Sequence, residues 1–202
     1  MHIYLIRHGE SEGNIKPNQI GQDENSPLTK YGLTQAYLLR NFLSKENILF
    51  DNVFSSPYVR ALSTAQIVCS HYASINIVPE LREYDPGEWR GKPRDNILTN
   101  DVKINMNSFG KRFLPPKGES FLMVERRISA WLDDHVLYEQ KLQNCNIALF
   151  SHGMTIRCLL HNIMGFDQSF ISKIAIENTS ITKLSFNDDG WKLLYLNNCS
   201  HL

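Results

Sequence analysis

The stretch YLIRHGESEGN, residues 4–14, begins with apolar residues and changes abruptly to an arginine, a histidine and a glycine. A short apolar run of this kind predicts a buried strand over 3–6. A second run, IALF at 147–150, is also followed by a histidine and a glycine, in SHG at 151–153. Strands that are apolar throughout are typical of a parallel sheet covered on both faces, so these stretches favour an α/β fold.

Helix-like patterns alternate with the predicted strands. Apolar residues at helical spacing predict helices over about 29–44 and 154–164. Another helix is expected to begin with Ser56 as its N-cap and Pro57 as its first residue, since proline suits the first helical position. A long helix is expected to begin near Glu119. This alternation is the pattern of a sheet that has helices packed on its faces.

Further strands are predicted over 52–55 and 75–78. The turn sequence NDDG separates two apolar stretches, 181–186 and 191–196, and this arrangement predicts a terminal hairpin. We therefore expect an α/β fold, a three-layer α/β/α sandwich around a mostly parallel sheet with helices on both faces.

The chain of 202 residues is long enough for one sizeable core, and we expect a single domain over 1–202. Helical periodicity fades at about 90–117, a segment with three prolines that we interpret as an insertion or lid. The segment contains two acidic residues, Asp95 and Asp101, and more basic ones: Arg90, Lys92, Arg94, Lys103, Lys111, Arg112 and Lys117. They form either a solvated loop or a surface that favours substrates with a second anionic group.

Composition excludes several classes of function. Lys+Arg and Asp+Glu both number 21, so the net charge of zero predicts no nucleic-acid partner and no anionic membrane partner. No stretch approaches the ~18 consecutive apolar residues of a membrane span, and we expect a cytoplasmic protein. The cysteines lack the spacing of a zinc site, which predicts reduced thiols; they are Cys69, Cys145, Cys158 and Cys199.

Charged and polar residues follow each of the four predicted parallel strands. Arg7 and His8 follow the first, Arg60 lies in the first turn of the helix after the second, Glu83 follows the third and His152 follows the fourth. The carboxyl ends of parallel strands meet at one edge of an open sheet, where ligands bind. We therefore expect these five side chains to meet at one site.

Two interpretations of this set are open. The first is an internal ion-pair network around Glu83, in which the histidines have packing roles. The second is an anion site, because one carboxylate leaves two arginines and two imidazoles with excess positive charge. The position of Arg60 favours an anion site. A cation in the first turn of a helix is repelled by the positive end of the helix macrodipole, which costs about 0.3–1 kcal/mol unless an anion lies between them.

A phosphate group suits such a site. Its oxygens accept the paired N–H donors of arginine. One imidazole can attack phosphorus while the other, protonated, holds a phosphoryl oxygen. His152 and His161 do not have the i, i+4 spacing of a shared metal site, and we expect neither a metal nor a cofactor.

Five motifs resemble the histidine phosphatase superfamily, also called the phosphoglycerate mutase-like family. In chain order they are RHGES at 7–11, SSPYVRALSTA at 55–65, LREYDPGEWRG at 81–91, GES at 118–120 and SHG at 151–153. Two weaker similarities are LTKYGLTQA at 28–36 and ENTSIT at 177–182. The ordered set spans nearly the whole chain and is far more specific than RHG alone.

The resemblance implies catalytic roles. His8 would be the nucleophile that forms a phosphohistidine, and Arg7, Arg60 and His152 would complete the phosphate pocket. Glu83 would donate a proton to the leaving oxygen and then activate water as a base. A neutral imidazole is a competent nucleophile near pH 7, and the surrounding positive charge would keep His8 unprotonated.

The resemblance also implies binding roles and partners. Asn14 would contact the outer phosphate oxygens, the backbone near Gly21 and Gln22 would face the substrate, and Gly153 would offer the N–H groups of a helix start. The substrate would be a small phosphorylated metabolite or a phosphopeptide. Family members occur as monomers and as homodimers, and both states are open for this chain.

Three activities are compatible with the resemblance. The sequence REYDPGEWRG at 82–91 resembles the phosphatase branch, which favours a phosphomonoester hydrolase. The alternative is a phosphoglycerate mutase-type isomerase, although mutases of the glycolytic type are usually longer and tend to read RHYG and LQG in this region. A third candidate is an inactive phosphate-binding module, which predicts loss of a catalytic residue, yet all five are present.

Overall fold

The computed structural model describes residues 1–202 except 17, 22, 73, 138–141 and 143. The described strands form one sheet with the order β3-β2-β4-β1-β5-β6, in which the pairs among the first four are parallel and the last two strands are added antiparallel. The strands are β1 (His2–Arg7), β2 (Asn52–Ser55), β3 (Asn76–Ile77), β4 (Asn146–Ser151), β5 (Ile181–Asn187) and β6 (Gly190–Asn198).

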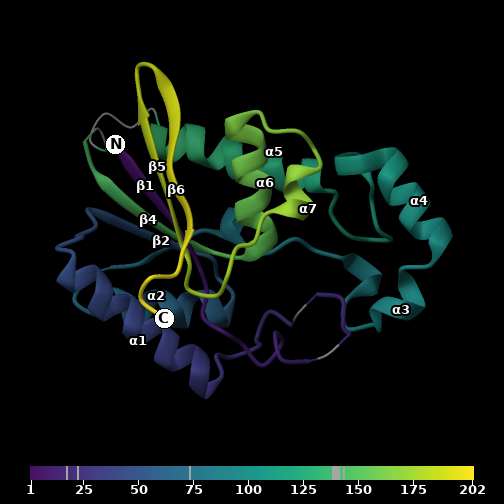
Figure 1. Ribbon diagram of the computed structural model, residues 1–202, viewed down its shortest axis with the longest axis horizontal. Helices are drawn as coiled ribbons and strands as arrows, with labels where there is room; N and C mark the ends of the chain where they lie inside the picture. Colours follow the sequence, from purple (N-terminus) through teal and green to yellow (C-terminus); the bar gives the residue numbers. More distant parts are fainter. Residues whose placement is uncertain (17, 22, 73, 138–141, 143) are drawn as a thin grey trace.

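Long helices cover both faces of the sheet (Figure 1). On one face lie α1 (Lys30–Lys45) and α2 (Val59–Val68), and on the other lie α5 (Phe121–Leu132) and α6 (Gly153–Met164). This arrangement confirms the predicted three-layer α/β/α sandwich and its mostly parallel sheet.

The central strands are apolar on both sides because each side meets a helix layer. In β1, Ile3 and Leu5 belong to the core beneath α5 and α6, whereas Tyr4 and Ile6 belong to the core beneath α1 and α2. All four are almost fully buried. The strand therefore shows no alternation between apolar and polar residues, as the sequence predicted.

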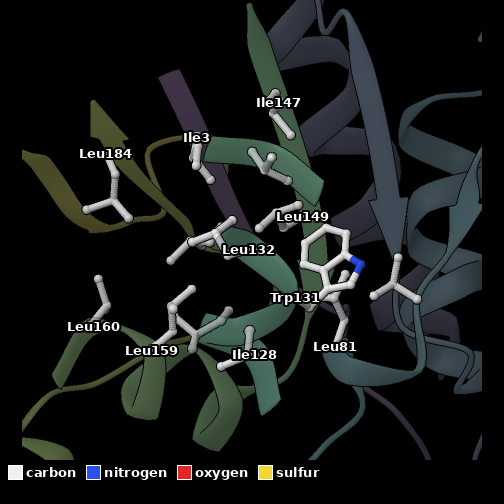
Figure 2. Close-up of a cluster of buried hydrophobic side chains, with 14 of the residues drawn as sticks. Ile3, Leu81, Ile128, Trp131, Leu132, Ile147, Leu149, Leu159, Leu160 and Leu184 are labelled. Carbon is white, nitrogen blue, oxygen red and sulfur yellow. The ribbon is translucent and has the colours of Figure 1, made fainter. Parts of the chain in front are cut away.

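The core on the α5 and α6 face is shown in Figure 2, where aliphatic side chains from the sheet meet those of the helices. Trp131 of α5 packs edge-on against Phe54 of β2, with 5.1 Å between the ring centroids. This core packs against the strands, and the charged residues follow the carboxyl ends of those strands.

Shorter helical segments complete the described chain. None of the helices in the described ranges is long and apolar enough to cross a membrane. The shorter segments are η1 (Pro79–Leu81), η2 (Gly87–Trp89), α3 (Arg94–Ile97), α4 (Asn100–Phe109), η3 (Gly110–Arg112), the π-helical η4 (Asp133–Leu137) and α7 (Phe170–Lys173).

The segment 90–117 contains two helices, α3 and α4, that the sequence did not predict. The Thr99 side chain caps α4 by accepting a hydrogen bond from Val102 N at 3.4 Å. Val102, Met106 and Phe109 have helical spacing, but this apolar pattern is short and lies between prolines, and none of the residues of the helix is buried. Figure 1 shows α3 and α4 extending away from the sheet at the right of the view.

The expected start of the helix after β2 is wrong. The N-cap is Tyr58 and the first helical residue is Val59, rather than Ser56 and Pro57. The Ser56 hydroxyl is 2.8 Å from His152 Nε2, and it also accepts a hydrogen bond from Tyr58 N at 3.3 Å. The serine therefore contacts the histidine after β4, and the helix begins two residues later than predicted.

The loop after β1 lies directly on the start of α1. Glu10 O accepts a hydrogen bond from Thr29 N at 2.9 Å, and Gly9 N donates to Thr64 Oγ1 of α2 at 3.0 Å. A Cβ atom added to Gly32 would lie only 2.0 Å from Glu10 O. The backbone next to His8 can approach α1 this closely only because Gly32 has no side chain.

We expect Gly32→Ala to destabilise the protein, although alanine favours an ordinary helix over glycine by about 1 kcal/mol. Displacement of the Glu10 backbone should lower the free energy of unfolding by about 1–3 kcal/mol in urea denaturation. Thr34→Ala, at an exposed position of the same helix, is the matched control and should change stability by less than about 0.5 kcal/mol. Equal or greater stability of Gly32→Ala would contradict the close approach.

Candidate active site

The pairing of β1 with β4 brings the two strand-end histidines together. Arg7 is opposite Ser151 in the register, and His8 N donates a hydrogen bond to Ser151 O at 3.0 Å. The ring centroids of His8 and His152 are 5.1 Å apart, and both side chains are buried. The predicted convergence of these residues at one edge of the sheet is therefore present in the structure.

The hydrogen bonds of His8 define its tautomer. Nδ1 is 2.7 Å from Gly9 O, and because a carbonyl oxygen only accepts, Nδ1 carries the proton. Nε2 is left with its lone pair and accepts a hydrogen bond from Arg60 Nε at 3.3 Å. Burial, followed by the charges of Arg7 and Arg60, holds the pKa of His8 well below 6.5. The ring is therefore neutral near pH 7, and its Nε2 lone pair is directed at Arg60.

The two arginines bind backbone carbonyls rather than carboxylates. Arg60 Nη1 donates to Asp23 O at 2.8 Å, and Arg7 Nη1 donates to Ile176 O at 2.6 Å. Arg7 Nε is buried and has no hydrogen-bond partner within the described ranges. In the same ranges neither guanidinium forms an ion pair within 4 Å. This geometry favours an anion site over an internal network centred on Glu83.

His152 supplies a second imidazole to the same site. Nε2 contacts the Ser56 hydroxyl, and Nδ1 is buried without a hydrogen-bond partner in the described part of the chain. Burial and the neighbouring charges of Arg60 and Arg7, with His8 contributing, hold the pKa of His152 well below 6.5. His152 is therefore neutral near pH 7 in this arrangement, whereas the sequence-based expectation was a protonated ring.

Glu83 is held at the N-terminus of α6. Its Oε1 accepts hydrogen bonds from Tyr84 N at 2.9 Å and Thr155 N at 3.1 Å, and its Oε2 accepts from Met154 N at 3.3 Å. The negative charge of Glu83 stabilises the charged forms of Arg7 and Arg60, and it counteracts the lowering of their pKa values by burial. The carboxylate thus lies beside the arginine pair without bonding directly to it.

Arg127 of α5 fixes the segment that carries Glu83. Its guanidinium donates to the backbone carbonyl of Arg82 at 2.9 Å and also bonds to the Glu80 carbonyl. Glu119 holds Arg127 in turn, with contacts of 3.0 and 3.1 Å. Sequence reasoning quoted GES at 118–120 without giving Glu119 a role, and it missed Arg127. A cation on the inner face of a long helix was the only available signal.

The expected phosphate-binding residues lie near the site in different ways. Asn14 Oδ1 accepts hydrogen bonds from Ser11 N at 3.0 Å and from Asn178 Nδ2 at 3.3 Å. Asn178 also donates to His8 O at 2.9 Å, a role that sequence reasoning missed. Gly153 begins α6 beside the Arg7 guanidinium, where an added Cβ would lie 3.6 Å from Arg7 Nε.

Gly21 has a positive φ of 68°, and an added Cβ would lie 2.7 Å from Pro86. It borders the same cavity as Glu83, which has a volume of about 270 Å³. Gln22, the remaining expected substrate-facing residue, lies outside the described residues. In the ranges that the structure describes, no group of three or more His, Cys, Asp and Glu side chains could hold a metal ion.

Three cations of the segment 90–117 have carboxylate partners outside it. The pairs are Arg90–Asp85 at 2.8 Å, Lys111–Glu125 at 2.9 Å and Lys117–Glu88 at 2.8 Å. Arg94 instead lines the cavity beside Glu83. The local excess of positive charge is therefore partly neutralised by the rest of the protein, and only part of it is directed toward the site.

We expect stability to fall on mild acidification because His8 and His152 have lowered pKa values. An unfolded histidine titrates near 6.5, so below that pH the unfolded chain binds more protons than the folded one. The free energy of unfolding should therefore decrease from pH 7 to pH 5.5, by at most about 1.4 kcal/mol per pH unit for each histidine. Urea denaturation at the two pH values measures this, and His8→Asn should weaken the dependence. Equal stability at both values would contradict the two shifts.

Comparisons with known proteins cover nearly the whole chain. A sequence model of the histidine phosphatase superfamily (branch 1) matches residues 3–199. "Probable phosphoglycerate mutase GpmB" of Yersinia pestis (strain Pestoides F) is 28% identical over 196 residues, which are 95% of this chain and 87% of the relative.

Two solved structures have the same fold. A mutant phosphoserine phosphatase from Entamoeba histolytica, in complex with phosphoserine, is 27% identical with a TM-score of 0.83, and the match covers 100% of this chain and 98% of that chain. The mycobacterial glucosyl-3-phosphoglycerate phosphatase in complex with VO3 is 23% identical with a TM-score of 0.83, covering 97% and 98% of the two chains. At this identity the second likeness bears on the fold alone.

Proposed function

The chain belongs to the histidine phosphatase superfamily, and on this premise we propose that it hydrolyses phosphate monoesters through a phosphohistidine on His8. The observation that carries the proposal is the orientation of His8. Its Nδ1 is bound to Gly9 O, and its Nε2 lone pair lies beside the buried Arg60 guanidinium, where an anionic phosphoryl group would bind. The nucleophile and the cation that attracts its target are therefore adjacent.

In the proposed reaction, the substrate binds to the groups that have no anionic partner among the described residues. Arg7 and Arg60 donate to the phosphoryl oxygens, and Gly153 offers the N-terminal backbone of a 12-residue helix. The His152 ring lies 5.1 Å from the His8 ring, centroid to centroid, and completes the pocket. A bound phosphate dianion favours the protonated form of His152, which offsets the effect of burial and restores its role as a donor.

The reaction proceeds in two steps. The first step starts with Glu83 protonated. The His8 Nε2 lone pair exchanges its hydrogen bond from Arg60 for a bond to phosphorus, the bond from phosphorus to the ester oxygen breaks, and Glu83 gives its proton to the departing alcohol. In the second, Glu83 accepts a proton from water as the water oxygen attacks phosphorus. The bond between phosphorus and Nε2 then breaks, which returns neutral His8 and releases inorganic phosphate.

The mutase alternative has one observation in its favour, the 28% identity with a relative whose name is that of a phosphoglycerate mutase. A phosphoglycerate mutase must bind a substrate that carries a carboxylate and a phosphate in addition to the phosphoryl group on the histidine. It must also shield its phosphohistidine from water. The cavity beside Glu83 is mostly apolar, and Arg94 is the one cation among its described lining residues. This lining favours hydrolysis. An assay with 3-phosphoglycerate discriminates the two, since dominant isomerisation over phosphate release would support the mutase.

We expect His8→Ala to abolish turnover of p-nitrophenyl phosphate and to remove the covalent phosphate label. Rapid quenching of the wild-type protein with labelled substrate should give a label that is stable in base and lost in acid, as expected for phosphohistidine. His71→Ala, at an exposed position away from the site, is the matched control and should keep both turnover and label. A wild-type protein with neither turnover nor label would be an inactive binding module.

Glu83→Gln should impair alkyl phosphates more than activated aryl phosphates. An alkoxide is a poor leaving group that needs a proton, so we expect kcat/KM for ethyl phosphate to fall about 10²–10⁴-fold. The effect on p-nitrophenyl phosphate should be less than about tenfold. Glu80→Gln, three residues earlier, is the control and should leave both values unchanged. Equal losses for the two esters would show that Glu83 is not the proton donor.

A further inference from the structure

We infer that this chain acts on phosphate monoesters whose alcohol portion is predominantly apolar, with an anionic group modestly favoured at its far end. The inference rests on the proposed hydrolysis, since it requires that Glu83 meets the leaving oxygen. It goes beyond that activity by assigning the cavity that receives the alcohol and the chemistry that this cavity selects.

The cavity of about 270 Å³ is placed to receive the leaving group. Glu83 lies on its wall, and so does Met154, whose backbone N–H binds the Glu83 carboxylate at 3.3 Å. The Arg7 guanidinium lies beside Gly153, next in the chain to Met154. The charge of Glu83 stabilises the charged forms of both arginines proposed to bind phosphate. An ester with its phosphoryl group at His8 and its bridging oxygen at Glu83 therefore extends its alcohol into this cavity.

The walls of the cavity are mainly apolar. They come from segments far apart in the sequence and include Ile20, Trp89, Leu98, Met106, Phe121 and Met154. Among the described lining residues, the side chains with hydrogen-bonding nitrogen or oxygen atoms are Glu83, Tyr84, Arg94 and Trp89, the last through its indole N–H. A sugar or polyol would place several hydroxyl groups against carbon without hydrogen-bond partners, which is unfavourable. An alkyl or aromatic group would instead gain from transfer out of water.

Arg94 adds a single positive charge to this apolar cavity. It forms no ion pair within 4 Å in the described ranges, in contrast to Arg90, Lys111 and Lys117, whose charges are matched by carboxylates. Arg94 is exposed, so it lies where the cavity meets solvent. A carboxylate or second phosphate at the far end of the alcohol can therefore pair with it without being buried.

The length of the cavity is limited by three side chains. Tyr84, Met106 and Phe121 also line a second cavity of about 330 Å³ on their other side. Tyr84 and Phe121 are held together edge to face, with ring centroids 5.1 Å apart. Met106 is the flexible member of the partition, and its removal would join the two cavities.

The test is a series of n-alkyl phosphates from methyl to decyl, with kcat/KM measured by release of inorganic phosphate. Alkyl alcohols differ little in leaving-group pKa, so the series isolates the contribution of the cavity. We expect kcat/KM to rise about fourfold with each added methylene over the first few and then to level off. sn-Glycerol 3-phosphate should be a poorer substrate than propyl phosphate, which has the same number of carbons.

Variants locate the effect in the cavity. Leu98→Asn should reduce the ratio of kcat/KM for hexyl over methyl phosphate at least fivefold, and Met106→Ala should move the plateau to longer chains. Arg94→Gln should remove a two- to fivefold preference for an ω-carboxyalkyl phosphate over the uncharged ester of equal length. Ile104→Asn, at an exposed position on the same helix as Met106, is the control and should change none of these values.

The outcomes separate this inference from the proposed function. Turnover with no dependence on chain length, or with glycerol phosphate preferred over propyl phosphate, would overturn the inference and leave hydrolysis established. Absence of turnover with every ester, including p-nitrophenyl phosphate, would overturn the proposed function and the inference together.

Discussion

The parallel pairing of β1 with β4 is the constraint on which the site depends. The ladder places Arg7 opposite Ser151, and the hydrogen bond from His8 N to Ser151 O extends it by one residue. Beyond this point the chain leaves the sheet, and His8 and His152 project beside each other. The cores on both faces of the two strands fix this register, because a shift of one residue would exchange the side chains that face the two helix layers.

Electrostatics in the site follows from that burial. Two guanidinium groups held by backbone carbonyls keep their charge, and two imidazoles packed among them lose their protons. The same arrangement leaves His8 neutral, as the proposed nucleophile must be, and leaves positive charge without an anionic partner in the described ranges. The proposed ligand binding and catalysis therefore have a common origin in the removal of these groups from water, and the same burial lowers the stability of the folded protein below pH 6.5.

The sequence predicted the central layers and the residues at the strand ends because burial leaves a direct pattern in them. The central strands are apolar because both of their faces are covered, and the helices are amphipathic because one face is covered. This pattern is interrupted at Arg7, His8, Arg60, Glu83 and His152. The positioning residues could not be predicted in this way. Arg127 and Asn178 bind backbone atoms that are distant in sequence, and no local pattern reports such contacts. The start of α2 was misplaced because the Ser56 hydroxyl contacts His152.

The helix α4 contributes no buried residue to the fold, yet Met106 on it borders the cavity beside Glu83. Substitutions along this helix should therefore have little effect on the free energy that holds the sheet and the strand-end residues together. The lining of the cavity can change at Met106 at little cost in stability, so the shape of the cavity can evolve independently of the residues at the strand ends.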